Sequence, residues 1–357
     1  MKVYIKFLSI LFLKNILYVT GILFCLVIVI NLLGELEFFK ETKVNNYFPL
    51  FLTILNSPSM IYELFPFIFL IGTQLFYVNL LNNDQINIFK YSGLKNSKIF
   101  LILSILSFFT GLLIVIFFYN FSSNLKNIYL EFKSPYTTDG KYLAVITKNG
   151  LWIKDRINNK NLIINSEKIE KNFLIENFIT EFDSKFKSTR NITSKKIDIT
   201  SNNWMIYDAK IFIKNEYVFK EKLNLETNFD YKRIMSLYSN LSSLNIYQLY
   251  ELRENYKKLN YSSTEVDLQI LKIISFPFYL LLMTLFSASM MLRIKYLNSS
   301  TIKILLGLFF SVIIYYVNNF FYVLGSSERL PLIIAVFFPI LILASIDSLL
   351  IRKINEK

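Results

Sequence analysis

The chain has 357 residues, of which 54% are hydrophobic, and its mean hydropathy is +0.42. This composition excludes a protein built on one soluble core, because such a protein needs a larger share of polar residues for its surface. The formal charge of +13 does not indicate a nucleic-acid partner, since the excess lies largely in short segments beside apolar stretches and in a lysine-rich central region.

Uncharged stretches long enough to cross a bilayer, which takes about 20 apolar residues, occur six times along the chain. They lie between charged residues at positions 14 and 35, 63 and 84, 98 and 126, 272 and 293, 303 and 328, and 329 and 347. The first is long for the apolar region of a signal peptide, and no cleavage pattern follows Leu33, so we expect an uncleaved helix. The uncharged interval 43–63 is interrupted by prolines and asparagines, and it predicts an interfacial lead-in to the second span.

The short basic segments between these stretches all fall on one side of a six-span topology. They contain Lys2, Lys6 and Lys14, then Lys90, Lys95 and Lys98, then Arg293, Lys295 and Lys303, and finally Arg352, Lys353 and Lys357. Short basic segments mark the cytoplasmic side of a membrane protein. Both termini are therefore predicted to be cytoplasmic, and residues 126–266 are predicted to lie on the opposite side.

The central residues 126–266 carry most of the polar patterning and predict a separate β-rich domain. Strands are expected at residues 142–146, 151–154, 172–182, 196–200 and 210–214, with turns at 149–150 and 158–160. A sandwich, a jelly roll or an open barrel would fit this pattern. Residues 244–260 have apolar side chains at helical spacing and predict an amphipathic helix. The expected domains are three helices in 1–125, the β domain in 126–266, and three helices in 267–357.

The residue types that most enzymes use are missing. The chain contains no histidine, which excludes Ser-His-Asp and Cys-His sites and most zinc sites. The string nearest to a phosphate-binding loop, residues 93–98, lacks the second glycine. Glu63 and Asp347 are expected near span ends, where they reach water, and this argues against a proton- or sodium-driven carrier. We expect no catalytic residue, metal site or cofactor, and a transport role rather than an enzyme.

Several strings, taken in order, resemble the lipopolysaccharide export permease family (LptF/LptG), and its LptG-like branch in particular. They are residues 62–73 in the second span, 150–155 at the start of the β domain, 276–293 in the fourth span, and 328–331 with Pro339 in the sixth. The resemblance covers nearly the whole chain. It implies a polytopic α-helical protein of the Gram-negative inner membrane, with six transmembrane helices and an inserted all-β, jelly-roll-like periplasmic domain.

The resemblance also implies a short cytoplasmic coupling helix, which here corresponds to residues 84–93. Gln85 stands where the family usually has a glutamate. Either Asp84 beside it supplies the missing charge to the partner ATPase, or this contact is weaker in this protein. The candidate contacts with a partner ATPase are therefore Asp84, Gln85, Ile88, Phe89 and Lys90. A plain cytoplasmic turn is the alternative, but Ile88 and Phe89 are costly to leave in water, which favours a docked helix.

What the resemblance implies for function is a permease subunit of an ABC-type exporter. Such a subunit would take lipopolysaccharide from the periplasmic leaflet, through a gate between the first and fifth spans, to a periplasmic β-jelly-roll bridge. The implied partners are a homologous LptF-like permease forming a heterodimer, a cytoplasmic LptB-like ATPase dimer and a bitopic LptC-like protein. The phosphorylated headgroup should meet cations near the outer interface, and the candidates are Lys40, Lys43 and Arg329.

Two other functions are compatible with the sequence. One is an ABC-associated accessory protein that relays force to its β domain and transports no substrate. The other is a membrane-bound glycan or lipid enzyme, which would need a pair of carboxylates in the outer domain. Lipid crosslinking within the first and fifth spans separates the first alternative from a permease, and loss of turnover on removing a carboxylate pair would reveal the second.

Overall fold

The computed structural model describes residues 3–40, 42, 44–45, 47–133, 136, 151–157, 160–170, 172–183, 187–213, 216–227, 229–231, 234, 240–258, 262–293 and 299–355. By internal packing the chain divides into two units. The helical unit comprises Met1–Phe132, Leu241–Leu249 and Thr264–Lys357, and the sheet unit comprises Lys133–Asn240 and Tyr250–Ser263.

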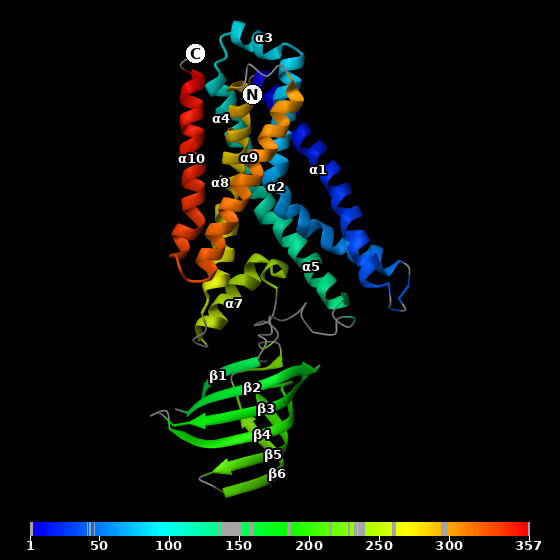
Figure 1. Ribbon diagram of the computed structural model, residues 1–357, viewed down its shortest axis with the longest axis vertical. Coiled ribbons are helices and arrows are strands. Elements are labelled where there is room, and N and C mark those ends of the chain that lie inside the picture. The colour runs from blue at the N-terminus through cyan, green and yellow to red at the C-terminus, as the bar shows by residue number, and fades with distance from the viewer. Residues whose placement is uncertain are drawn as a thin grey trace. The chain divides into compact units, whose positions relative to one another are not determined.

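The helical unit consists of long apolar helices (Figure 1). The first half contains α1 (Val3–Phe38), α2 (Phe48–Asn82), the short α3 (Gln85–Tyr91), and a third span formed by α4 (Asn96–Leu113), the π-helix η1 (Ile114–Tyr119) and α5 (Asn120–Lys133). The second half contains α8 (Thr264–Arg293), α9 (Ser300–Ser326) and α10 (Leu332–Asn355). Within the described residues, six helices are long and apolar enough to cross a bilayer, which confirms the predicted 3+3 arrangement.

The helices run further than the uncharged stretches that predicted them. Helix α2 has 35 residues, and its first turns include most of the interval 43–63 that was expected to be an interfacial lead-in. Pro58 and Pro66 lie inside this helix, and a proline within a helix removes a backbone donor and bends the axis. Figure 1 shows α2 changing direction part-way along its length. The lead-in is therefore a continuous part of the helix that forms the second span.

Helices α2 and α8 form the centre of the helical unit. In each, 61% of the most apolar 18-residue window is buried. The Ser287 hydroxyl donates to the carbonyl oxygen of Leu70 at 2.8 Å, and so joins α8 to α2. Gly111 on α4 allows the backbone to approach Pro277 on α8, since a Cβ there would lie 3.0 Å from the Pro277 Cα. Small and hydroxyl-bearing residues at such crossings are the usual means of packing membrane helices.

The third span changes its helical pitch at η1. Tyr119, the last residue of η1, donates from its hydroxyl to the carbonyl oxygen of Leu244 at 2.9 Å. The next residue, Asn120, accepts a hydrogen bond from the backbone N–H of Ile246 at 3.1 Å. Both bonds hold the segment that contains the 3₁₀ turn η3 (Leu241–Ser243) and the start of α7 (Ile246–Lys258). The pitch change therefore occurs where this segment attaches to the third span.

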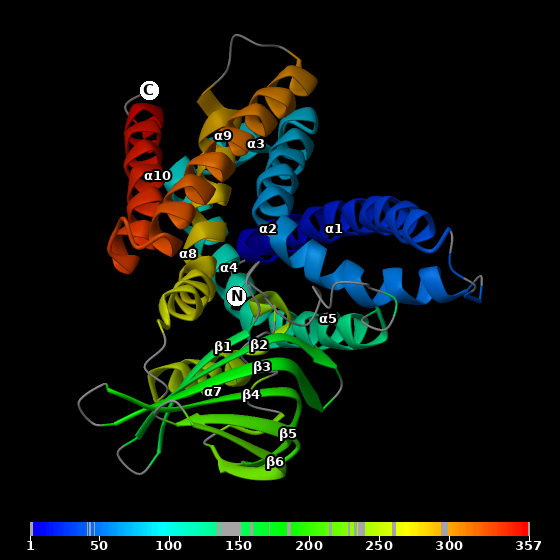
Figure 2. The same ribbon diagram turned by 60° about the horizontal axis from the view of Figure 1, so that its bottom comes forward.

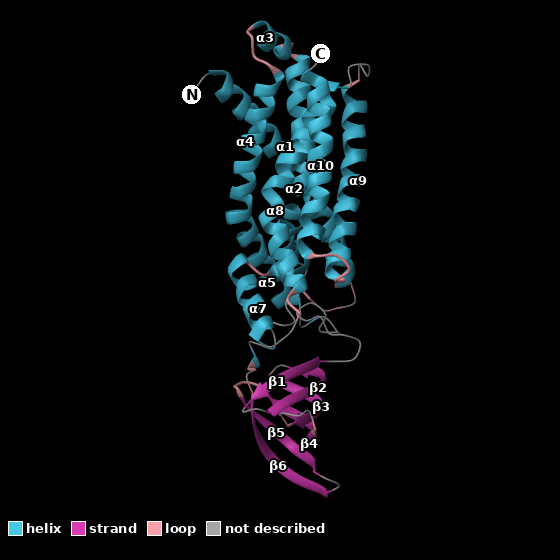
Figure 3. Ribbon diagram, turned by 90° about the vertical axis from the view of Figure 1, so that its left-hand side faces the viewer, coloured by secondary structure: helices cyan, strands magenta, loops and turns pink. Residues whose placement is uncertain are grey.

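Both described ends of the chain lie at the same end of the helical unit as α3 (Figure 3). Helix α2 ends at Asn82, immediately before α3, and α8 ends at Arg293 before the connection to α9. This end of the helical unit is called the α3 end. It carries the exposed lysines Lys95 and Lys98.

The sheet unit contains an antiparallel sheet whose described strands pair in chain order (Figure 2). The strands are β1 (Leu151–Ile157), β2 (Lys160–Glu170), β3 (Phe173–Phe182), β4 (Ser188–Asp198), β5 (Asn203–Ile213) and β6 (Glu216–Glu226). Each pairs with the next, as in Ile164↔Ile179 between β2 and β3. The described strands thus form one open meander rather than a closed barrel, and no jelly-roll crossover is among their pairings. An all-β insert between two groups of three helices is confirmed.

One face of the sheet carries the core. Alternate residues point to the same side of a strand, and Ile164, Ile179, Ile192 and Ile206 are all fully buried. Trp204 is also fully buried in this core, and its indole N–H donates to the carbonyl oxygen of Phe229 at 2.7 Å. The expected strands at 151–154, 172–182, 196–200 and 210–214 correspond to β1, β3, β4 and β5. The expected strand at 142–146 and the turn at 149–150 lie outside the described residues.

Helix α7 lies in the range that the amphipathic pattern predicted. Leu249 and Leu252 are buried on one side of it. Tyr247, which was expected on the same apolar side, is exposed. The helix is thus amphipathic with a narrower apolar stripe than its sequence indicated.

Candidate functional site

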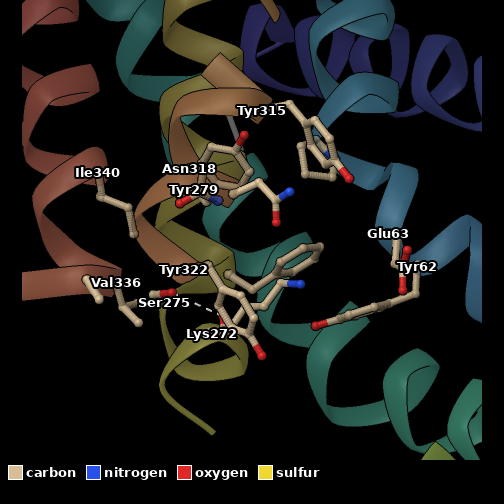
Figure 4. Close-up of a pocket in the computed structure, with 14 residues that line it drawn as sticks. Tyr62, Glu63, Lys272, Ser275, Tyr279, Tyr315, Asn318, Tyr322, Val336 and Ile340 are labelled. Carbon is tan, nitrogen blue, oxygen red and sulfur yellow. Dashed lines mark hydrogen bonds between the residues drawn. The ribbon is translucent and has the colours of Figure 1, made fainter. Parts of the chain in front are cut away.

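A polar cavity lies among the transmembrane helices α2, α8, α9 and α10, and its volume is about 100 Å³. Figure 4 shows side chains from α2 on one side, and from α8 and α9 on the other, pointing into it. Its polar lining comes from four tyrosines, two asparagines, a glutamate, a lysine and a serine: Tyr62, Tyr279, Tyr315, Tyr322, Asn318, Asn319, Glu63, Lys272 and Ser275. Val336 and Ile340 of α10 form an apolar wall.

The cavity lies about one hydrocarbon thickness away from the α3 end. Glu63 is 19 residues before the end of α2, and at about 1.5 Å per residue this corresponds to roughly 28 Å. Lys272 is 21 residues before the end of α8, or roughly 32 Å. The hydrocarbon core of a bilayer is about 30 Å thick. If the α3 end lies at one membrane surface, the cavity lies at the level of the opposite headgroups.

Two opposite charges line the cavity. Glu63 and Lys272 are both exposed in the isolated chain, and among the described residues neither forms an ion pair within 4.0 Å. The Lys272 ammonium lies 5.4 Å from the ring centroid of Tyr322, within the range of a cation–π contact. A second lysine, Lys126, is close enough to Glu63 for their charges to interact, and its ammonium donates to the Ser242 hydroxyl at 2.6 Å.

Tyr62 separates this cavity from a smaller one. Its ring stacks on Phe276, with centroids 4.7 Å apart, and packs against Tyr119 at 5.0 Å. The side chain is 8% exposed, and its hydroxyl has no hydrogen-bond partner among the described residues. Tyr62, Glu63 and Lys272 line both cavities. A buried hydroxyl without a partner costs about 1–3 kcal/mol, so this group is available to a ligand or to water.

Three of the four helices around the cavity carry an internal proline close to it. They are Pro66 in α2, Pro277 in α8 and Pro339 in α10. Proline has no backbone N–H, so the carbonyl group four residues earlier loses its regular helical donor. Those carbonyls belong to Tyr62 and Ala335, which line the larger cavity, and to Ile273, which lines the smaller one. Each of these prolines thus leaves a residue that lines one of the cavities with a carbonyl group that lacks its regular helical donor.

Comparison with known proteins decides the family. Residues 7–353 match the family described as lipopolysaccharide export system permease LptF/LptG. The chain belongs to the LptF/LptG family. The match covers both groups of helices and the inserted sheet, and it does not distinguish an LptG-like from an LptF-like subunit. No curated protein matches the chain closely enough to count as a relative. The protein is thus a multi-pass membrane permease of lipopolysaccharide export.

Two of the three residues predicted to meet the headgroup, Lys40 and Arg329, do not line the cavity of this LptF/LptG permease. Lys40 follows α1 and is exposed, and Arg329 is exposed in the turn between α9 and α10. Lys43 lies outside the described residues. Figure 1 shows the end of α1 and the turn between α9 and α10 on opposite sides of the helical unit, so the structure does not bring Lys40 and Arg329 together.

The candidate coupling helix of the permease is formed as α3, at the α3 end. Asp84 precedes it with a left-handed backbone (φ 51°), and its carboxylate accepts a hydrogen bond from the Asn87 amide at 3.2 Å. Asp84, Ile88 and Tyr91, at positions i, i+4 and i+7, are all exposed and share one face. Tyr91 was not among the predicted contacts.

The other candidate coupling residues have different surroundings. Phe89 packs on Phe7 of α1, with ring centroids 6.2 Å apart, and Gln85 is partly buried. The side-chain oxygen of Gln85 has no partner among the described residues. The backbone of Lys90 lies in α3, whereas its side chain lies outside what the structure describes. Of the predicted contacts, Asp84 and Ile88 are therefore exposed, whereas Gln85 and Phe89 are partly buried.

Asp347 does not lie where the sequence suggested. It was expected at a span end with access to water, but its side chain is 1% exposed. Neither carboxylate oxygen has a hydrogen-bond partner among the described residues. The expectation is wrong because α10 continues for two further turns beyond Asp347, so the charged residue that ended the uncharged stretch does not end the helix.

Proposed function

We propose that this chain is the lipid-binding permease subunit of an ABC-type lipopolysaccharide exporter, and that the headgroup binds in the cavity at Glu63, Lys272 and Tyr62. The observation that carries the proposal is a charged, polar cavity on helices that are otherwise apolar. At the level of the headgroups, such a cavity offers charged and hydrogen-bonding groups to the polar part of a lipid. A phosphorylated sugar with attached acyl chains matches such a cavity beside apolar helices.

In this proposal the acyl chains enter along α1 and α9. Only 17% of the most apolar window of α1 and 11% of that of α9 are buried within the chain, against 61% for α2 and α8. The exposed positions on α9 include Phe309, Tyr316 and Phe320. Apolar helices with so little cover need lipid or a second subunit against them. A homologous permease subunit forming a heterodimer would supply the other wall of the passage.

Energy for export would come from a separate ATPase dimer docked at α3. Asp84, Ile88 and Tyr91 form the proposed contact face, with one charge and two apolar side chains. The chain itself has no phosphate-binding loop in its sequence. The same proposal assigns the α3 end and both termini to the cytoplasm and the sheet unit to the periplasm of a Gram-negative inner membrane, because the short connection after α3 carries the exposed lysines Lys95 and Lys98.

The sheet unit would then receive the lipid and pass it to a β-jelly-roll bridge that includes a bitopic LptC-like partner. An isoleucine-rich core face and an open strand order support this part of the proposal. Lys40, Lys43 and Arg329 stay candidates for a first electrostatic contact with phosphates outside the cavity. The roles of Lys40 and Arg329 are separable from that of the cavity, because neither lines it.

Photocrosslinking tests the proposed lipid path. A photoreactive amino acid would be introduced at Phe309 of α9, which is 62% exposed, in the complex within its native membrane. A matched control uses Phe117 of the third span, which is also aromatic and is 67% exposed. We expect lipopolysaccharide adducts at Phe309 and few at Phe117, as judged by immunoblotting after irradiation.

Two outcomes would refute the permease proposal. Equal labelling at the two positions would mean that Phe309 meets only bulk membrane lipid. Absence of lipopolysaccharide adducts at Phe309, at Tyr316 and at exposed positions of α1 such as Leu17 would instead favour an accessory protein that relays force without transporting a substrate.

A further inference from the structure

The charges of the cavity are mixed, and this constrains its ligand. A headgroup that carries phosphates alone would be attracted by Lys272 and repelled by Glu63, because both side chains line the same small space. Glu63 is exposed on the cavity side and has no ion-pair partner within 4.0 Å among the described residues. A ligand that brings its own cation would remove this repulsion.

The backbone around the cavity also favours a donor. The carbonyl group of Tyr62, next to Glu63, loses its regular helical donor to Pro66, and both Tyr62 and Glu63 line the cavity. A primary ammonium group has three N–H donors and no acceptor. It therefore matches a site that combines a carboxylate with a carbonyl oxygen that has lost its regular donor.

The remaining polar groups suit a phosphate. Lys272 lines the cavity beside Tyr322. Ammonium groups form strong, short hydrogen bonds with phosphate oxygens. The Tyr62 hydroxyl, which has no partner in the described part of the chain, can donate to a phosphate oxygen bound by Lys272.

We infer that the cavity selects a headgroup that carries both a phosphate and a primary amine, such as a phosphoethanolamine substituent on the phosphorylated sugar. Glu63 and the neighbouring carbonyl oxygen of Tyr62 accept from the ammonium, and Lys272 binds the phosphate. The inference rests on the proposed function, and it specifies which form of the lipid the permease prefers.

A competition experiment tests this preference. The complete permease complex in nanodiscs is loaded with a fluorescent lipid A, which is then displaced by unlabelled lipid A or by the same lipid A carrying one phosphoethanolamine group. One additional charge-assisted contact corresponds to a preference of about tenfold for the amine-bearing lipid. In the Glu63→Gln variant we expect the ratio of the two dissociation constants to fall to about one.

Controls separate this result from general damage to the site. Glu37→Gln removes an exposed carboxylate on α1 and should leave the wild-type ratio unchanged. Lys272→Met should weaken binding of both lipids, because both carry phosphate. Size-exclusion profiles check that each variant complex is assembled, and since Glu63 is exposed its replacement leaves the helix packing intact.

The outcomes distinguish the inference from the proposed function. A wild-type ratio near one, or an unchanged ratio in Glu63→Gln, overturns the amine selectivity while lipid A binding and the crosslinks to Phe309 still support a lipid permease. Failure of both lipids to displace the probe from the wild-type complex overturns the proposed function and the inference with it.

Discussion

One buried polar side chain of α2 forms hydrogen bonds with α9, and it gives a quantitative prediction. Gln74 of α2 is fully buried, and its amide nitrogen donates to the carbonyl oxygens of Lys303 at 3.2 Å and Ile304 at 3.5 Å. Gly307, one turn further along α9, leaves the space through which this amide passes, since a Cβ there would collide with the amide nitrogen. Replacing Gly307 by alanine should therefore expel the Gln74 amide.

The cost of Gly307→Ala follows from the interactions that it breaks. An interhelical hydrogen bond within a membrane is worth about 0.6 kcal/mol and at most about 1.7 kcal/mol, and a buried amide left without partners costs about 1–3 kcal/mol. Alanine has a higher helix propensity than glycine, which offsets up to about 1 kcal/mol of this loss in stability. We expect a net loss of about 2 kcal/mol in the free energy of unfolding, measured in micelles by titration with SDS and followed by circular dichroism at the helical band.

A double-mutant cycle tests the physical reason. In a Gln74→Ala background the amide is gone, so Gly307→Ala should be neutral or stabilising by up to about 1 kcal/mol. The coupling energy should therefore be about 2 kcal/mol or more. An equal cost of Gly307→Ala in both backgrounds would refute the reasoning, because the new methyl group would then collide with something other than Gln74.

Three further predictions concern other parts of the chain. Asp84→Lys should lower co-purification of the ATPase by more than about tenfold while membrane insertion is retained. The control Asp208→Lys changes an exposed aspartate that also has a left-handed backbone (φ 51°), and it should leave co-purification unchanged. Normal co-purification with Asp84→Lys would exclude the contact. Tyr119→Phe should cost about 1 kcal/mol of stability, since the Leu244 carbonyl loses its donor; an unchanged SDS midpoint would show that water replaces the hydroxyl. Trp204→Phe should destabilise the sheet unit by about 2 kcal/mol through loss of the bond to Phe229 and the space left behind; a near-ultraviolet signal that melts at the wild-type temperature would contradict it.

Much of the architecture could be predicted because hydrophobicity and charge act over long stretches. A run of about 20 apolar residues has few alternatives to a transmembrane helix. In β3, β4 and β5, apolar and polar residues alternate because one face of the sheet is buried. Strand β6 gave no such signal, because Leu225 is the only buried residue among those described in it. Strand β6 forms through its antiparallel pairing with β5. Such an edge strand is specified by tertiary contacts more than by its own pattern.

The candidate site was missed for a related reason. Charged residues were used to define where each uncharged stretch ended, so Glu63 and Lys272 were taken as span boundaries rather than as side chains on continuing helices. Helices α2 and α8 run through both positions. The sequence contained a usable signal, namely an internal proline in each of α2, α8 and α10, but the convergence of three separate helices on one cavity depends on packing that no single segment encodes.

The π-helical stretch η1 has a consequence for how the third span tolerates change in length. A π-turn closes over one more residue than an α-turn, and one residue corresponds to a rotation of about 100° around a helix axis. The chain thus carries an inserted residue between Gly111, which faces α8, and Tyr119 and Asn120, which hold residues 244 and 246. Removing one residue from Ile114–Tyr119 would leave an unbroken helix but turn its second half by more than a quarter of a revolution. The number of residues in this stretch therefore determines which side of the second half faces its neighbours.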